Sequence, residues 1–136
     1  MEMIIDFPGG VRVDAHLGPL TVQTDQPVND GGQGSAPSPF TLFLASLGTC
    51  AGFYVLSFCR SRGIPTDGIR VIQKSETHPQ THMVSRILLE IQLPPEFPEK
   101  YRAGLMRAAD QCKVKKHLEL PPAIEVTASL ADTIHA

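Results

Sequence analysis

An uncharged stretch constrains the fold of this chain more than any other feature, because residues 31 to 59 contain no Asp, Glu, Lys, Arg or His. Within it, Ser38 is a suitable helix N-cap and Pro39 suits the first helical position. A glycine and a proline soon after Arg62 are stop signals, so the pattern predicts one long helix from Pro39 to about Arg62. Apolar residues lie on nearly every face of this helix, which is typical of a buried helix.

The chain has 136 residues, the length of one ordinary domain, and we expect a single domain over residues 1–136. A chain of this size has few elements with which to cover every face of such a helix. We therefore expect an obligate homodimer in which two of these helices pack together. Gly48 and Gly52 have the spacing that allows two helices to approach closely.

The same stretch is also long enough to cross a membrane, since about 20 apolar residues suffice. Hydroxyl side chains at Thr41, Ser46, Thr49 and Ser57 argue against a membrane helix, as do the strand patterns on both sides, which need a core to cover. We expect a water-soluble chain without a membrane partner.

Period-2 alternation predicts strands before and after the helix, and a second amphipathic pattern predicts another helix. This order of elements favours an α+β fold with antiparallel sheets over a parallel doubly wound sheet. The expected strands are Met3–Phe7, 11–16, Leu20–Thr24, Ile69–Lys74, Met83–Leu93 and Ala123–Leu130, and the second helix is Glu96–Cys112.

Charge and cysteine content limit the possible partners and location. Twelve Lys and Arg against fourteen Asp and Glu give a net charge of −2, which supplies no electrostatic reason to expect a nucleic acid. The N-terminus lacks the basic and apolar parts of a signal peptide. Three cysteines are an odd number and fit a secreted disulfide framework poorly, so we expect a cytoplasmic protein with free thiols.

The cysteines are the residues best suited to chemistry. Cys50 and Cys59 lie nine residues apart on the predicted helix, which places them on opposite sides and about 13.5 Å apart along the axis, too far for a disulfide. Cys112 precedes several lysines, whose positive charge favours a thiolate. Each cysteine, taken alone, is also compatible with the role of a small buried apolar residue.

Other common sites lack their motifs. No C-x-x-C or H-E-x-x-H spacing occurs, and we expect no metal site. No G-x-S-x-G turn is present for a serine hydrolase. The glycines from Gly31 to Gly34 match neither a P-loop nor a dinucleotide-binding motif, so no cofactor is expected.

The segment from Gly31 to Cys50, GGQGSAPSPFTLFLASLGTC, resembles the OsmC/Ohr family, named for osmotically inducible protein C and organic hydroperoxide resistance protein. In that family a Gly-rich loop leads into a proline-started helix that carries a reactive cysteine, and a second cysteine ends a later helix. Here Cys50 follows Pro39 by eleven residues and Cys112 follows Cys50 by 62. The order of elements and the chain length also match.

The resemblance implies an intertwined homodimer with antiparallel sheets wrapped around long central helices. It also implies reduction of organic hydroperoxides in oxidative-stress defence, with Cys50 as the peroxidatic and Cys112 as the resolving cysteine. An external dithiol would recycle the enzyme. Arg12 lies in the region of the family's site arginine and is the candidate cation that favours the Cys50 thiolate. Cys59 matches neither motif and is expected to be structural.

Two positions depart from the family pattern. Phe40 and Thr41 stand where the peroxidases often have a glutamate that orients the arginine, and Lys113 stands where a proline is frequent. The missing glutamate favours an alternative function, that of an OsmC-like redox-sensing or small-molecule-binding protein without efficient peroxidase activity.

Overall fold

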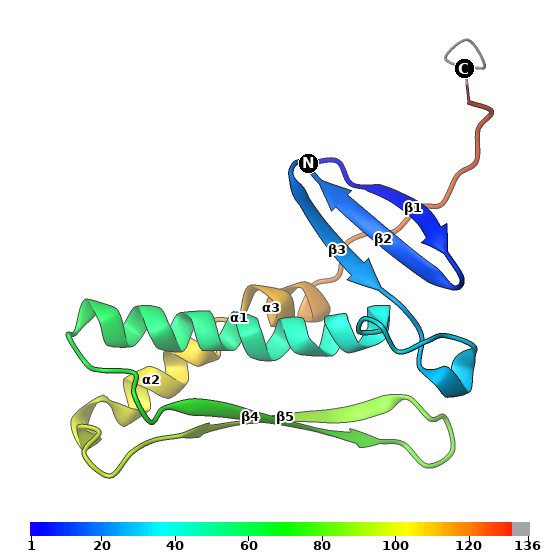
Figure 1. The fold of residues 1–136 in the computed structure, drawn as a ribbon. Helices are drawn as coiled ribbons and strands as arrows, with labels where there is room; N and C mark the ends of the chain where they lie inside the picture. The colour runs from blue at the N-terminus through cyan, green and yellow to red at the C-terminus, as the bar shows by residue number, and fades with distance from the viewer. Residues whose placement is uncertain (132–136) are drawn as a thin grey trace.

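The computed structural model describes residues 1–131 and has an α+β fold with two antiparallel sheets (Figure 1). The β4–β5 hairpin runs along one side of the long helix α1, and the N-terminal sheet lies on the other side, near the start of α1 (Figure 1). The α-helices and strands, in chain order, are β1 Ile4–Gly9, β2 Arg12–Leu17, β3 Leu20–Thr24, α1 Pro39–Ser61, β4 Arg70–Thr77, β5 Val84–Gln92, α2 Arg102–Ala109 and α3 Lys113–Glu119.

The N-terminal sheet has the order β1-β2-β3, with each strand antiparallel to its neighbour. Leu17 pairs with Leu20, so only two residues form the turn between β2 and β3. Gly18 begins this turn with φ +55°, a conformation that glycine adopts at little cost. The three strands expected at the start of the chain are confirmed, with β3 over the predicted residues and β1 and β2 shifted by one or two.

The long helix begins and ends close to the predicted residues. The Ser38 hydroxyl accepts a hydrogen bond from the backbone N–H of Thr41 at 3.2 Å, and Pro39 occupies the first turn. Its buried residues are Leu47, Ala51, Val55 and Cys59, which follow one another at intervals of four and form a single stripe. Within one chain α1 therefore buries one face, and not every face as its composition led us to expect.

The core lies between α1, the β4–β5 hairpin and α2. Val55 and Cys59 of α1 pack with Leu105 of α2, which is completely buried. Gln73 of β4 ties the hairpin to the first half of α1, because its side-chain amide donates to the Leu44 carbonyl at 2.8 Å. Gly48 permits this approach, since a Cβ at residue 48 would lie 2.4 Å from the Gln73 amide oxygen.

The predicted second helix, Glu96–Cys112, is wrong, because this segment does not form one continuous helix and the helix within it is shorter. Residues Glu99–Tyr101 form a turn of 3-10 helix, α2 spans only Arg102–Ala109, and α3 begins separately after Cys112. Pro98 explains the late start, because a proline inside a helix removes a backbone donor and clashes with the preceding turn. The amphipathic pattern continued across the break and so concealed the boundary at residues 110–112.

The predicted last strand, Ala123–Leu130, is also wrong for this chain. Residues 121–131 have no secondary structure and run past the N-terminal sheet (Figure 1). Ile124, Val126 and Leu130 are at least 86% exposed. A strand forms only when a neighbouring strand accepts its hydrogen bonds, and no described strand pairs with this segment.

Candidate functional site

The fold brings Cys50 and Cys112 together, although 62 residues separate them in sequence. Cys50 lies in the middle of α1 and is half-buried, whereas Cys112 is only 2% exposed. The Cys112 thiol donates a weak hydrogen bond to the Leu47 carbonyl at 3.7 Å, one turn before Cys50 on α1. The Cys112 side chain also lies close enough to Cys50 to lower the pKa of the Cys50 thiol. Both cysteines are free thiols.

Cys112 is the N-cap of α3, where its sulfur accepts the backbone N–H of Lys115 at 3.4 Å. The lysines after Cys112 therefore belong to the start of a new helix and do not end the preceding one. This position places the backbone N–H groups of Lys113 and Val114 near Cys50 on α1. Both N–H groups lower the pKa of the Cys50 thiol. Sequence analysis missed this arrangement because cysteine is not among the residues that usually signal an N-cap.

These backbone groups shift the pKa of the Cys50 thiol. The hydrogen bond from the Val114 N–H is the main influence that lowers the pKa of the Cys50 thiol. Burial opposes it, while the Cys112 side chain and the N–H and positive charge of Lys113 lower the pKa further. The net direction is downward, so the site favours the thiolate, which is the reactive form of cysteine.

Cys59 occupies a different environment on the same helix. It is completely buried among core residues that include Val55 and Leu105. Burial raises the pKa of Cys59, and the nearby charge of Arg62 offsets this only in part. These surroundings match the structural role expected from its position outside both cysteine motifs.

Arg12 lies on β2, where its guanidinium forms an ion pair with Asp14 at 3.7 Å. The Nε atom of Arg12 is buried and has no hydrogen-bond partner among the described residues. Neither a hydrogen bond nor an ion pair joins Arg12 to Cys50 within residues 1–131. A single chain thus assembles the two cysteines without the arginine.

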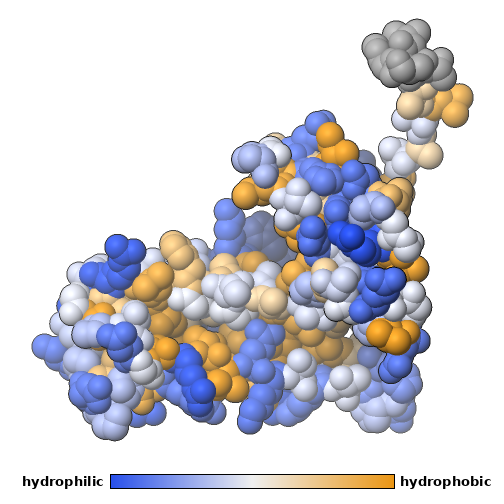
Figure 2. All heavy atoms as spheres, viewed as in Figure 1, coloured by the Kyte–Doolittle hydropathy of each residue, from blue (hydrophilic) through white to orange (hydrophobic). Residues whose placement is uncertain are grey.

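A largely apolar groove of about 830 Å³ adjoins Cys112, whereas Cys50 is not among the residues that line it. Leu47 and Ala51 of α1, Ile87 of β5, Leu105 of α2 and Cys112 contribute to its walls. The charged residues at the groove are Glu90, Arg102, Arg107, Asp110 and Lys115. Apolar side chains gather below α1 on the face shown in Figure 2. An apolar molecule in this groove would lie next to Cys112, with charged side chains nearby.

Asp25 organises the Gly-rich loop that leads into α1, and sequence analysis did not single it out. Its side-chain oxygens accept hydrogen bonds from the backbone N–H groups of Gln26, Gln33 and Ser35, and from the Ser35 hydroxyl. The bonds from Ser35 contribute most to lowering the pKa of Asp25 to about 2. A Cβ at Gly32 would lie 1.9 Å from the Gln26 carbonyl oxygen, so this loop requires glycine there.

α1 also has the length and hydropathy of a membrane-spanning helix, a property shared by core helices of soluble proteins. In this structure the hairpin β4–β5 and helix α2 pack against it, so α1 serves as the core helix of its own chain. Core helices of soluble proteins pack in this way, which agrees with the water-soluble chain expected from the sequence.

Similar solved structures share the fold over most of the chain. An osmotic stress induced and detoxification response protein from Psychrobacter arcticus is 26% identical, with 84% of this chain and 85% of that chain covered and a TM-score of 0.69. An organic hydroperoxide resistance protein OsmC from Legionella pneumophila is 17% identical, with 87% and 89% covered and a TM-score of 0.52. An organic hydroperoxide resistance protein from Vibrio cholerae, with captopril bound in one of its active sites, is also 17% identical, with 86% and 84% covered and a TM-score of 0.51.

No curated protein matches the chain. The family model of the OsmC-like proteins matches residues 32–127, which include the Gly-rich loop, both helices of the core and the two cysteines Cys50 and Cys112. Because this match covers well over half of the chain, the protein belongs to the OsmC-like family.

Proposed function

We propose that this protein is a thiol-dependent peroxidase that reduces organic hydroperoxides with Cys50. Membership of the OsmC-like family supports a redox or peroxide-resistance role. The observation that carries the finer proposal is the contact of Cys50, whose pKa is lowered, with a second free thiol at Cys112. A reactive thiolate beside a thiol that can form a disulfide is the minimum that the reaction requires.

In the first step, the Cys50 thiolate attacks one oxygen of the peroxide and the O–O bond breaks. The other oxygen leaves as an alkoxide and takes up a proton to give an alcohol, while Cys50 becomes a sulfenic acid. The Val114 N–H, which leads the groups that lower the pKa of Cys50, increases the fraction of the attacking sulfur that is deprotonated. The thiol has lost two electrons and the peroxide has gained them.

In the second step, the Cys112 sulfur attacks the Cys50 sulfur, forms a disulfide and releases water after protonation. Cys112 hydrogen-bonds to the Leu47 carbonyl, one turn before Cys50, so its sulfur lies near the sulfur that it attacks. An external dithiol then returns two electrons and two protons, which restores both free thiols. The physiological reductant is thus expected to be a dithiol small molecule or protein.

The groove beside Cys112 supports an organic substrate. The groove beside Cys112 is lined mainly by aliphatic residues, so an alkyl or aryl hydroperoxide would bury apolar surface there. Hydrogen peroxide has no apolar part and would gain nothing from these walls.

We further propose a cytoplasmic homodimer in which the Arg12 of one protomer serves the site of the other. Phe53 on the open face of α1 is 60% exposed, and the apolar segment 123–130 lacks a pairing strand in its own chain. A second copy could cover both. The unpartnered Nε of Arg12 would then gain a role that no described residue of its own chain supplies.

The alternative is a redox-sensing or small-molecule-binding protein that retains the fold. Phe40 and Thr41, which replace the expected glutamate, favour it, and so does the engagement of Arg12 with Asp14. In a small-molecule-binding protein Cys50 would be oxidised slowly, whereas in a sensor Cys50 would be oxidised without turnover.

The test is single-turnover loss of thiol on mixing the reduced protein with cumene hydroperoxide, followed by turnover with a dithiol. We expect Cys50 to react faster than an unstructured cysteine peptide at the same pH and to prefer cumene hydroperoxide over hydrogen peroxide. Equal rates for protein and peptide would remove the peroxidase proposal and favour the alternative. Faster oxidation without turnover would indicate a sensor.

A further inference from the structure

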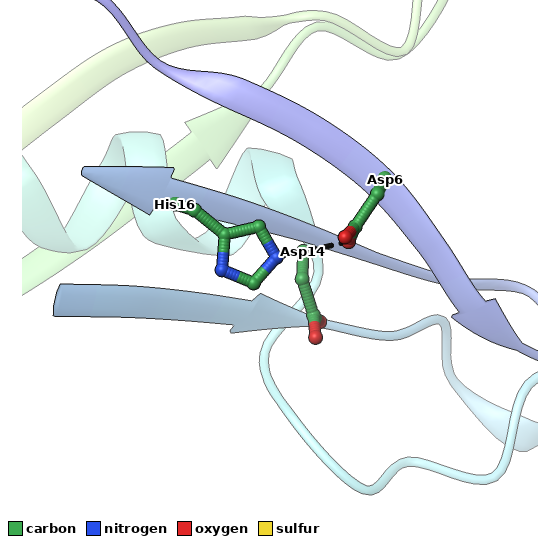
Figure 3. Close-up of side chains that lie close together, drawn as sticks. All are labelled: Asp6, Asp14 and His16. Carbon is green, nitrogen blue, oxygen red and sulfur yellow. Dashed lines mark hydrogen bonds and ion pairs between the residues drawn. The ribbon is translucent and has the colours of Figure 1, made fainter. Parts of the chain in front are cut away.

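We propose that Asp6, Asp14 and His16 form a binding site for a divalent manganese ion on the N-terminal sheet. Asp6 on β1 lies directly opposite Asp14 on β2, and His16 follows Asp14 by two residues, so all three side chains project from the same face. One potential ligand atom from each residue lies within 4.8 Å of the others. Figure 3 shows the imidazole of His16 facing the Asp6 carboxylate, with Asp14 beside them.

The burial of Asp14 is the observation that points to a ligand. Asp14 is only 7% exposed, and its Oδ1 atom is buried without a hydrogen-bond partner among the described residues. The nearest cation is the guanidinium of Arg12, whose Nη2 lies 3.7 Å from this oxygen, beyond hydrogen-bond distance. A buried carboxylate oxygen with one long ion pair and no hydrogen bond is costly, and a coordinated metal ion would satisfy it.

Two polar neighbours fix the orientation of the His16 ring. Its Nδ1 lies 3.1 Å from the Thr21 hydroxyl, and its Nε2 lies 3.0 Å from the Asp6 carboxylate. When Nδ1–H donates to Thr21, Nε2 carries a free lone pair directed at the cluster. Histidines that bind metals commonly hold their other ring nitrogen in this way, which fixes the tautomer.

The composition of the cluster narrows the choice of ion. The imidazole favours a transition-metal ion over Ca²⁺ and Mg²⁺, which prefer oxygen ligands alone, and the two carboxylates favour Mn²⁺ among the transition metals. Asp6 and Asp14 carry two negative charges against the single positive charge of Arg12, so the site keeps a net attraction for a cation. The side chains of Asp6 and His16 are 57% and 37% exposed, which leaves solvent access for the ion and room for water ligands.

Titration of the full chain with Mn²⁺, followed by the electron paramagnetic resonance signal of the free ion, tests this proposal. Mn²⁺ binds thiolates weakly, so Cys50 and Cys112 interfere less than they would with Zn²⁺. We expect saturable binding of one ion per chain. His16→Gln should weaken binding by more than about tenfold, and Thr21→Val, which removes the group that holds Nδ1, by about tenfold.

His82→Asn is the matched control, because His82 is an exposed histidine in the β4–β5 turn, and Asn tolerates its φ of 60°. It should bind Mn²⁺ as the unmodified protein does, and circular dichroism checks that each variant is folded. Absence of saturable binding at millimolar Mn²⁺ would overturn the proposal and leave an ordinary hydrogen bond between His16 and Asp6. Unchanged affinity in folded His16→Gln would overturn it as well. Neither readout depends on peroxidase activity.

Discussion

The middle and the end of α1 each carry a cysteine, and the pKa values of the two thiols are shifted in opposite directions. Cys50, in the middle, is half-buried against the start of α3, and the Val114 N–H leads the groups that lower its pKa. Cys59, near the end, lies in an apolar core, and burial raises its pKa. The difference arises because α3 directs backbone donors at one sulfur, whereas the other meets mainly carbon. Contact with helix-start N–H groups therefore distinguishes the reactive thiol from the structural one.

The largest expected effect is on the reaction of Cys50 itself. At neutral pH we expect iodoacetamide to modify Cys50 more than about tenfold faster than Cys59, because the two pKa values move in opposite directions and Cys59 is inaccessible. Mass spectrometry of tryptic peptides over a time course measures both rates. Cys50→Ser should abolish peroxide consumption, and Cys59→Ala should preserve it. Comparable labelling rates of Cys50 and Cys59 in folded protein would refute the claim that their surroundings make only Cys50 reactive.

The next effect concerns recycling. Cys112→Ser should leave the first oxidation of Cys50 in place but block disulfide formation, because the resolving thiol acts only on the sulfenic acid. A dimedone adduct at Cys50 would then accumulate, and steady-state turnover would fall. Peptide mapping of mildly oxidised unmodified protein should give a Cys50–Cys112 disulfide with Cys59 still a thiol. A dominant bridge to Cys59 would contradict the assignment.

A smaller effect concerns the loop that leads into α1. The folded pKa of Asp25 is about 2, below the ordinary value of 3.8, so the Asp25 carboxylate stabilises the fold above pH 3.8. This contribution declines as the pH falls from 3.8 through 2. Asp25→Asn should lower the melting temperature at neutral pH and remove this part of the acid dependence. Asp67→Asn, an exposed substitution after α1, is the control.

If thermal melts of Asp25→Asn between pH 2 and 5 run parallel to those of the unmodified protein, the loop does not depend on the Asp25 charge. If the rate of Cys50 labelling also changes in this variant, the loop and the thiol site are coupled through the start of α1. An unchanged labelling rate would show that the loop does not influence the reactivity of Cys50.

Much of the fold could be predicted because the relevant signals are local. Pro39 after Ser38 marks the start of α1, and alternation marks β2 and β3, since both depend only on neighbouring residues. The errors occur where a partner decides the outcome. Segment 123–130 alternates like a strand yet has no described neighbour, and Pro98 and the break before Cys112 divide a pattern that periodicity alone reads as one helix.

The sequence by itself determined the α+β class, the long helix and the spacing of the two cysteine motifs, because propensity, capping and hydrophobic period act over a few residues. Only the tertiary structure decided that Cys112 caps α3, that the Val114 N–H acts on Cys50, and that Arg12 pairs with Asp14 in its own chain. A thiol's pKa depends on the donors, charges and solvent around it, and these come from segments distant in sequence. The identity of a reactive cysteine can therefore be anticipated from a motif, but its reactivity is a property of the folded chain.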